Sequence, residues 1–349
     1  MFFKLNNSME TWLDLNTVNL LGRVDSRIDK DHLIRTIAQA YRLGKVISYR
    51  QIHEGIEDYN LKLNTKTGTY LVKVFSQFKS FRHVKDNVHG LNIFKDAGVR
   101  VPELYKTKRG KYVYYYESNK VSVLACVMEY FSGKSFLKIK REPTLTEMKN
   151  LIPDIAKIHA TQFKPQGVYD VWVAYNLCAE YEKKKVFLTN ENNKLIKKSL
   201  SFMRQFDLSK CTKGTIHGDL HRTNILTNHR GDLRIIDFSV MEYNAIVVDL
   251  AVFIALFCIN PPIQLPKQAA FTYQEVIQEY LKYGSLNAYD KSILFDLMRA
   301  TYAINHLAGS YELKGKGSDS EETRYWVDIG SAGMKLMDEI MNSVGELSF

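Results

Sequence analysis

The sequence lacks the features that mark secreted, zinc-stabilised or membrane-spanning chains. Its 349 residues contain only four cysteines and no C-x-x-C pair, so neither a disulfide framework nor a zinc site is predicted. We expect reduced thiols in a cytoplasmic protein. The first seven residues lack the continuous apolar region of a signal peptide. The longest apolar run, 246–259, is interrupted by Asp249 and is too short to cross a bilayer, so we predict a buried helix and no membrane span.

Nor does the sequence contain the mixture of basic and aromatic residues that is typical of nucleic-acid-binding modules. The formal net charge is +10, and the densest basic segments, 106–111, 134–141 and 183–185, are predicted to be solvated surface. We therefore expect no nucleic-acid partner. The positive charge also disfavours a polycationic substrate, which would require an acidic pocket.

The most informative stretch spans residues 215–238. Short apolar runs on both sides of a polar loop predict buried strands that hold the loop rigid, and the turn 228–232 reverses the chain after the loop. This arrangement predicts that Asp219 and Asn224 project from the loop into one cleft.

These residue types suit phosphoryl transfer. A hydroxyl that attacks the terminal phosphate of ATP needs a carboxylate to orient it and accept its proton, which is the role predicted for Asp219. Magnesium neutralises charge on the phosphoryl group, prefers hard oxygen ligands and retains several waters. The amide oxygen of Asn224 and the carboxylate of Asp237 are the predicted metal ligands. The alternative is a polar turn in which Asp219 is a solvated loop carboxylate.

The motifs His217-Gly218-Asp219 with Asn224, and Ile236-Asp237-Phe238, resemble the catalytic and metal motifs of the aminoglycoside phosphotransferase and choline kinase superfamily. Members of this superfamily are relatives of protein kinases. The resemblance covers about 41–307 and implies an α+β, bilobal protein-kinase-like fold. An N-terminal antiparallel five-stranded sheet with one main helix is expected, followed by a larger, mainly helical lobe.

The sequence contains no repeat and no low-complexity linker, so the boundary between the two lobes is expected to be tight. Residues 1–131 are predicted to form the nucleotide-binding lobe, with 1–30 as a candidate extension. Residues 132–349 are predicted to form the catalytic and acceptor-binding lobe.

Lys73 is the predicted phosphate-binding lysine of the first lobe. It lies among apolar residues in the predicted strand 69–75, where a buried ammonium group needs an anionic partner; alternatively it snorkels from an edge strand. In the family this lysine is oriented by a glutamate on the following helix, but the predicted helix 81–97 contains none. Asn87 falls near the expected position, and the adjacent Asp86 is the candidate substitute.

Two further nucleotide contacts follow from the resemblance. Gly55 lies in the turn of the first predicted hairpin, which covers the phosphates in the family, although a single glycine is equally typical of an ordinary hairpin turn. The segment 127–133 resembles the interlobe hinge, where the Glu129 carbonyl and the Phe131 N–H would bind adenine. A plain strand end is the alternative.

Hydrophobic periodicity predicts the other elements. Helices are expected at 31–41, 144–159, 192–206, 272–283, 290–307 and 324–341, and strands at 46–53, 58–63, 69–75, 111–116 and 122–128. A capping box from Thr144 to Glu147 opens the helix 144–159, which Pro153 is predicted to kink or divide.

Several other residues are assigned by the same resemblance. His159 is predicted to lie in the core or behind the site and not to be catalytic. Asp249 is predicted either to accept N–H groups from the catalytic loop or to be a simple N-cap, and its role is structural in both cases. The predicted acceptor contacts, which are alternatively core or surface residues, are Tyr302, Asn305, His306 and Tyr311.

The resulting hypothesis is an ATP- and Mg²⁺-dependent small-molecule kinase that phosphorylates a hydroxyl of an amino alcohol, amino acid, sugar or antibiotic. The segments 41–46 and 55–60 resemble homoserine-kinase-type members. The alternative is a catalytically weak or inactive kinase-like binding or structural protein of the spore-coat type. The missing helix glutamate and the single glycine favour this alternative, and the intact catalytic motifs oppose it.

Overall fold

The computed structural model describes residues 24–25, 27–52, 58–118 and 121–344. Within these ranges the chain forms two compact units. The first unit contains residues up to 134 together with 226–239, and the second contains 135–225 and the residues from 240 onward. The predicted lobes, 1–131 and 132–349, stay a prediction, since both include residues outside the described ranges.

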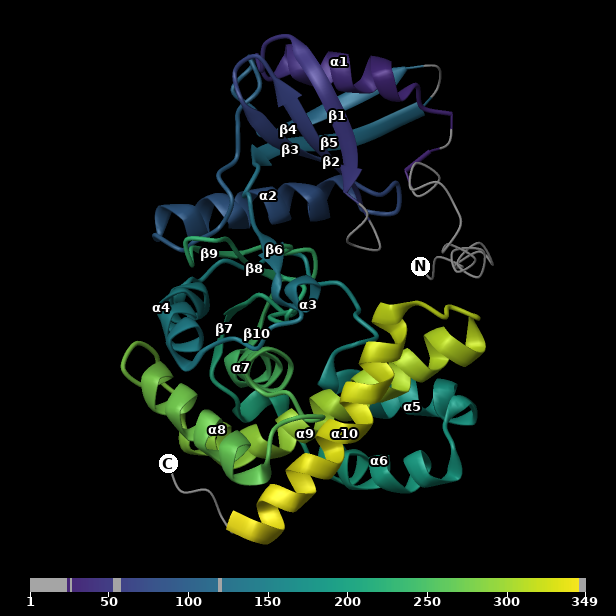
Figure 1. The fold of residues 1–349 in the computed structure, drawn as a ribbon, viewed down its shortest axis with the longest axis vertical. Helices are drawn as coiled ribbons and strands as arrows, with labels where there is room; N and C mark the ends of the chain where they lie inside the picture. The colour runs from purple at the N-terminus through teal and green to yellow at the C-terminus, as the bar shows by residue number, and fades with distance from the viewer. Residues whose placement is uncertain (1–23, 26, 53–57, 119–120, 345–349) are drawn as a thin grey trace. The chain divides into compact units, whose positions relative to one another are not determined.

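The first unit is built on an antiparallel five-stranded sheet in the order β1-β2-β3-β5-β4 (Figure 1). The strands alternate buried and more exposed residues, which is the pattern of a sheet with two different faces. The sheet has the predicted number of strands, and the predicted strand positions are confirmed to within a few residues. The bounds are β1 Val46–Ile52, β2 Tyr59–Thr65, β3 Thr69–Val74, β4 Val113–Ser118 and β5 Val121–Glu129.

Helix α1, Lys30–Ala40, covers one face of this sheet. The Asp29 side chain caps the helix by accepting a hydrogen bond from the His32 N–H. Its apolar residues recur at helical spacing and share one core with inward residues of the strands, among them Leu63 and Val72. Since side chains alternate along a strand, Lys73 points to the face opposite that of Val72.

Helix α2, Phe81–Asp96, follows β3 and packs against β4 and β5. Ser80 caps its first turn, and Gly98 follows its last turn with φ of +75°, a backbone conformation that favours glycine. The helix predicted at 81–97 is therefore confirmed.

The second unit is mainly helical (Figure 1). The helices predicted at 192–206, 290–307 and 324–341 are present, and the one predicted at 272–283 begins earlier, at Pro266, because proline is favoured in a first helical turn. The bounds are α3 Phe136–Ile139, α4 Leu145–Ala160, α5 Leu177–Lys184, α6 Asn190–Met203, α7 Ile246–Phe253, α8 Pro266–Tyr280, α9 Ala288–Ser310 and α10 Glu321–Val344.

Helix α4 is not divided by Pro153, so of the two predicted effects of this proline, a kink or a division, the division is wrong. One continuous helix runs through the proline. Proline in a helix interior costs about 3 kcal/mol, and the fully buried side chains of Leu151, Ile152 and Ile155 provide the packing that offsets this cost. The predicted capping box is confirmed, because Thr144 and Glu147 each accept a hydrogen bond from the other's backbone N–H.

This capping box gives a first testable prediction. Thr144→Ala removes the side-chain acceptor of the Glu147 N–H, so we expect the free energy of unfolding to fall by about 1 kcal/mol. Urea denaturation measures the change. Thr146→Ala, in the exposed first turn of the same helix, is the matched control and should stay within about 0.5 kcal/mol of the unmodified protein. Equal stability of both variants would contradict the proposed cap.

The strands before and after the polar loop do not pair with each other, although they are neighbours in sequence. β7, Lys213–Ile216, pairs with β10, Glu242–Ala245, and not with the next strand in sequence. β6, Lys134–Ser135, β8, Ile225–Thr227, and β9, Leu233–Ile235, form a separate three-stranded sheet in the order β6-β8-β9. The polar loop therefore connects two different sheets.

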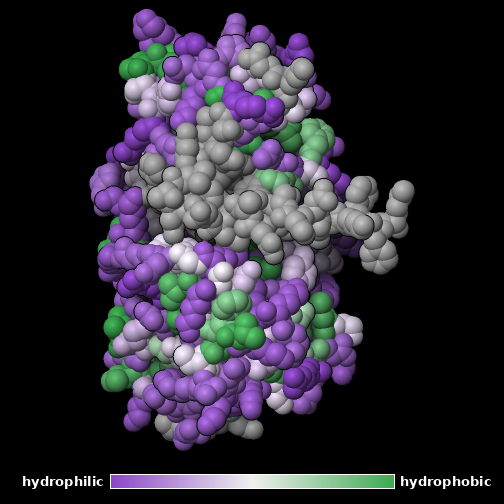
Figure 2. Space-filling model, turned by 90° about the vertical axis from the view of Figure 1, so that its right-hand side faces the viewer, coloured by the Kyte–Doolittle hydropathy of each residue, from purple (hydrophilic) through white to green (hydrophobic). Residues whose placement is uncertain are grey.

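The apolar run predicted to be a buried helix is α7 and its continuation to Cys258, and all of its residues are buried. None of the helices in the described ranges has the length and apolar content needed to span a membrane. On the face drawn in Figure 2, hydrophilic residues predominate and apolar ones form small separate groups.

Candidate active site

The carboxylate of Asp219 is held by two neighbours in its own loop. Oδ2 accepts a hydrogen bond from Asn224 Nδ2 at 2.7 Å, and Oδ1 lies 2.7 Å from His221 Nε2. The Thr223 backbone N–H donates to His221 Nδ1, so in the neutral ring the proton is on Nε2 and is donated to Asp219. Asp219 is nevertheless 38% exposed, which leaves it accessible to a ligand.

The side chain of Asp249 forms hydrogen bonds with the backbone of this loop. This carboxylate is completely buried and accepts the His217 N–H at 3.0 Å and the Gly218 N–H at 2.8 Å. His159 Nε2 lies 3.0 Å from the same carboxylate, and its Nδ1 lies 2.9 Å from the Tyr280 hydroxyl. The predicted structural roles of Asp249 and His159 are confirmed by these contacts. Asp249 lies inside α7 and is not its N-cap.

Gly218 is required by the shape of the loop. Its φ of +85° is a left-handed conformation that side chains disfavour, and a Cβ atom there would lie 2.8 Å from the Val240 carbonyl oxygen. This glycine lets the chain turn sharply between β7 and Asp219.

In the first unit, Lys73 and Asp237 meet as predicted for residues of one site. Lys73 Nζ donates to Asp237 Oδ1 at 3.1 Å. Burial alone would lower the pKa of Lys73, but the negative charges of Asp237 and Asp58 outweigh it and raise that pKa above its ordinary value. Burial alone would raise the pKa of Asp237, and the ammonium groups of Lys73 and Lys79 hold it well below its ordinary value. Both groups are therefore charged at neutral pH.

Asp237 has an unusual backbone conformation, with φ of +61°. Aspartate tolerates this left-handed region better than most residues, and such conformations cluster at functional sites. The next residue, Phe238, is buried and packs its ring 4.9 Å from that of Phe94 in α2. This packing holds the turn that orients the Asp237 carboxylate.

The candidate substitutes for the missing helix glutamate do not bind the lysine. Among the described residues, Lys73 makes its ion pairs with Asp58 and Asp237, and not with Asp86. Asp86 lies 3.9 Å from Arg82 one turn earlier in α2, and Asn87 Nδ2 lies 3.1 Å from His83 Nε2.

The hinge-like segment follows directly from β5. The Glu129 backbone N–H donates to the Glu103 carbonyl at 2.7 Å, and the half-buried Phe131 ring lies 5.1 Å from the Arg234 guanidinium. A Cβ at Gly133 would lie 2.6 Å from the Thr227 carbonyl oxygen, so a glycine is required where β8 approaches. These contacts order the segment. The Glu129 carbonyl takes part in none of them.

Gly55, the predicted phosphate-loop residue, lies outside the described residues. Of the predicted acceptor contacts, three are core residues whose side chains contact backbone carbonyls of their own unit: Tyr302 that of Ala255, Asn305 that of Thr301 and His306, through Nδ1, that of Val327. Tyr311 is half-buried and packs its ring 5.2 Å from that of Phe187.

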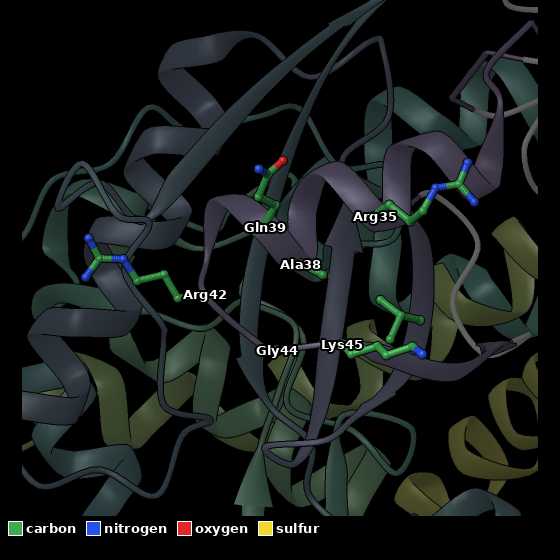
Figure 3. Close-up of a pocket in the computed structure, with 7 residues that line it drawn as sticks. Arg35, Ala38, Gln39, Arg42, Gly44 and Lys45 are labelled. Atoms are coloured by element: carbon green, nitrogen blue, oxygen red, sulfur yellow. The ribbon is translucent and has the colours of Figure 1, made fainter.

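A cavity of about 650 Å³ lies between α1 and the start of β1 and contains none of the predicted site residues. Arg35, Arg42 and Lys45 line it. Figure 3 shows the Arg42 side chain directed away from those of Arg35 and Lys45, so the three cations do not converge on one point.

Sequence reasoning identified Lys73, Asp219, Asn224 and Asp237 but missed two residues that contact them. The structure joins Lys73 to Asp237 within the first unit and Asp219 to Asn224 within the second. The missed residues are Asp58, on Lys73, and His221, on Asp219. His221 could have been predicted as a contact of Asp219, since it lies two residues away in the same polar loop.

Comparison with known proteins finds kinases among the relatives and among the similar solved structures. The chain is 23% identical over 224 residues to a homoserine kinase of Methylobacillus flagellatus, a match that covers 64% of this chain and 67% of that protein. A solved structure of an amicoumacin kinase in complex with AMP-PNP and Ca²⁺ aligns with a TM-score of 0.66 at 14% identity, covering 90% of this chain and 95% of that one. A microcompartment-associated aminopropanol kinase aligns with a TM-score of 0.63 at 16% identity, covering 90% and 100%.

The structural likenesses confirm the predicted α+β, protein-kinase-like fold, and the relatives confirm the resemblance to small-molecule kinases of the homoserine-kinase type. Residues 48–285, most of the chain, match the family described as the phosphotransferase enzyme family. The chain therefore belongs to the phosphotransferase enzyme family.

Proposed function

We propose that this protein transfers the γ-phosphoryl group of ATP, with Mg²⁺, to a hydroxyl group of a small molecule. The observation that carries the proposal is the ion pair between Lys73 and Asp237, 3.1 Å apart, in a chain whose Asp219 carboxylate is held by Asn224 and His221. A lysine for phosphates, a carboxylate for a metal and a carboxylate for the acceptor are the groups that such a reaction needs.

Asp219 is assigned the role of catalytic base. Its partly exposed carboxylate orients the acceptor hydroxyl and takes its proton as the new O–P bond forms. The hydrogen bonds from Asn224 and His221 restrict the carboxylate to one orientation, and this reduces the entropy cost of aligning the hydroxyl.

Asp237 and Asn224 are assigned to the metal, and both fit the requirements of Mg²⁺. This ion favours carboxylate and amide oxygens and is commonly held by one or two protein ligands together with waters and phosphate oxygens. Asp237 is 36% exposed, and Asn224 uses its amide nitrogen for Asp219. The Asn224 amide oxygen accepts a hydrogen bond from the Thr223 hydroxyl at 3.3 Å and keeps a second lone pair for a metal. When bound, the metal would neutralise negative charge on the transferring group.

Lys73 is assigned to the α- and β-phosphates, and Gly55 to the backbone that covers them. For adenine we assign the Glu129 carbonyl and the Phe131 N–H. The contacts of the Glu129 N–H and of the Phe131 ring support this assignment, because they order the segment while the groups needed for adenine take no part in them.

The acceptor class is inferred from the relatives. Because the homoserine kinases match about two thirds of this chain, a small amino acid with a primary hydroxyl is the first candidate. Amino alcohols, suggested by the name of the aminopropanol kinase, come next, and sugars and antibiotics follow. A screen of these alcohols for acceptor-dependent release of ADP tests the proposal. Failure of every acceptor class, at saturating MgATP, would overturn the transfer reaction.

The lysine assignment gives a further prediction. Lys73→Met removes the ammonium group that would bind the phosphates, so we expect the Kd for MgATP to rise about tenfold or more. Isothermal titration calorimetry measures this change. Lys85→Met, on the exposed side of α2, is the matched control and should leave the Kd unchanged. Equal affinity of the Lys73 variant and the unmodified protein would remove the basis for the phosphate assignment.

A further inference from the structure

Asp58, directly before β2, is a buried carboxylate that the proposed reaction leaves without a role. Its side chain is 3% exposed, and both of its oxygens are engaged. Oδ1 accepts the Ser76 backbone N–H at 3.0 Å. Oδ2 lies 3.0 Å from Lys73 Nζ and 2.8 Å from Lys79 Nζ. Asp58 thus joins the start of β2, the end of β3 and the segment after β3.

The two carboxylates on Lys73 have different surroundings. Asp237 is 36% exposed and is the proposed metal ligand, so its charge would be shared with the metal in the loaded protein. Asp58 is almost fully buried, and its bond to the Ser76 backbone fixes its orientation. A buried ammonium group needs an anionic partner at all times, and of the two carboxylates Asp58 is the one that stays with Lys73.

We propose that Asp58 is the positioning residue of the phosphate site: it holds Lys73 in place of a helix carboxylate and brings Lys79 beside it as a second cation. This inference rests on the proposed role of Lys73 toward phosphates. Asp58 acts through the two lysines and does not touch the nucleotide.

The charges of the cluster support a binding site for anions. Lys73 and Lys79 carry two positive charges against the single negative charge of Asp58, and both ammonium groups lie within 3.0 Å of its Oδ2. Burial raises the pKa of Asp58, but Lys73 and Lys79 outweigh this effect, so its pKa is lowered and the carboxylate stays charged. Once Asp237 is engaged by a metal, the two ammonium groups beside Asp58 attract phosphate groups.

The test compares two ligands that differ only in phosphates. The Kd values of MgADP and of adenosine are measured by isothermal titration calorimetry for the full chain and for Asp58→Asn. We expect the Kd for MgADP to rise about tenfold, the usual effect of losing one charged hydrogen-bonded contact, while the Kd for adenosine stays the same. A merely structural role of Asp58 would weaken both ligands together. Asp86→Asn, on α2, is the matched control and should change neither value.

A double variant shows whether Asp58 acts through Lys73. In the Lys73→Met background, Asp58→Asn should weaken MgADP by less than tenfold, because one of the two lysines that it positions is absent. Where Asp58→Asn does not fold, Asp58→Glu replaces it: the longer side chain displaces the ammonium groups, and MgADP should bind more weakly at unchanged adenosine affinity.

The outcomes separate this inference from the proposed function. If the unmodified protein binds neither MgADP nor MgATP, the proposed function fails. If it binds them and the Asp58 variants keep the original ratio of MgADP to adenosine affinity, the positioning role alone is overturned. A full tenfold effect of Asp58→Asn in the Lys73→Met background would also overturn it.

Discussion

Asp219→Asn should lower kcat for phosphoryl transfer by about 10²–10⁴-fold, the usual contribution of a general base. The substituted amide keeps the size of the carboxylate and can still accept the hydrogen bond from Asn224 Nδ2, but it cannot take a proton from the acceptor hydroxyl. Because Asp219 is assigned to the acceptor and not to the nucleotide, the Kd for MgATP should stay close to that of the unmodified protein. Steady-state kinetics with an acceptor found in the screen, together with calorimetry, gives both quantities.

Asp319→Asn serves as the matched control, since Asp319 is exposed and pairs only with Arg324 among the contacts seen in the described structure. Its kcat should equal that of the unmodified protein. Retention of more than about a tenth of the activity by Asp219→Asn would contradict the base assignment. Nucleotide binding with turnover that does not depend on Asp219 would favour the kinase-like binding protein considered from the sequence.

Asp249→Asn should lower the free energy of unfolding by about 3 kcal/mol, because a completely buried carboxylate loses its charge and part of its acceptor capacity. Its two oxygens accept the N–H groups of His217 and Gly218, and one of them also contacts His159. An amide has one acceptor oxygen, so at least one of these buried backbone N–H groups would face an NH₂ group. We expect kcat to fall as well, since these bonds hold the backbone that carries Asp219.

Chemical denaturation measures the stability change, and Asp319→Asn is again the control. An exposed ion pair contributes about 0–1 kcal/mol, so that variant should unfold near the midpoint of the unmodified protein. If Asp249→Asn were as stable as the control, the carboxylate would not be anchoring the loop, and its burial beside three donors would need another explanation.

In the first unit, local sequence patterns were sufficient to predict several strands and helices. Apolar residues along 69–75 and a glycine after Ala97 are local signals, and they located β3 and the end of α2. Asp58 is different, because nothing next to it in the sequence distinguishes it from a turn residue. Its role arises only when β2 pairs with β3 and brings Asn60, two residues away, opposite Lys73.

The sequence by itself determined the groups on which the proposed chemistry rests: a carboxylate, an amide and a second carboxylate at set spacings, and one lysine in an apolar strand. Spacing along the chain is sufficient for this, because hydrogen-bonded loops and strands place nearby residues reproducibly. Only the tertiary structure decided which groups support them. Asp249 reaches the loop from a helix thirty residues later, β7 pairs with β10, and Asp58 takes the lysine that a helix carboxylate was expected to hold. These contacts join residues far apart in sequence, and they depend on how buried surfaces pack, which periodicity within one segment does not encode.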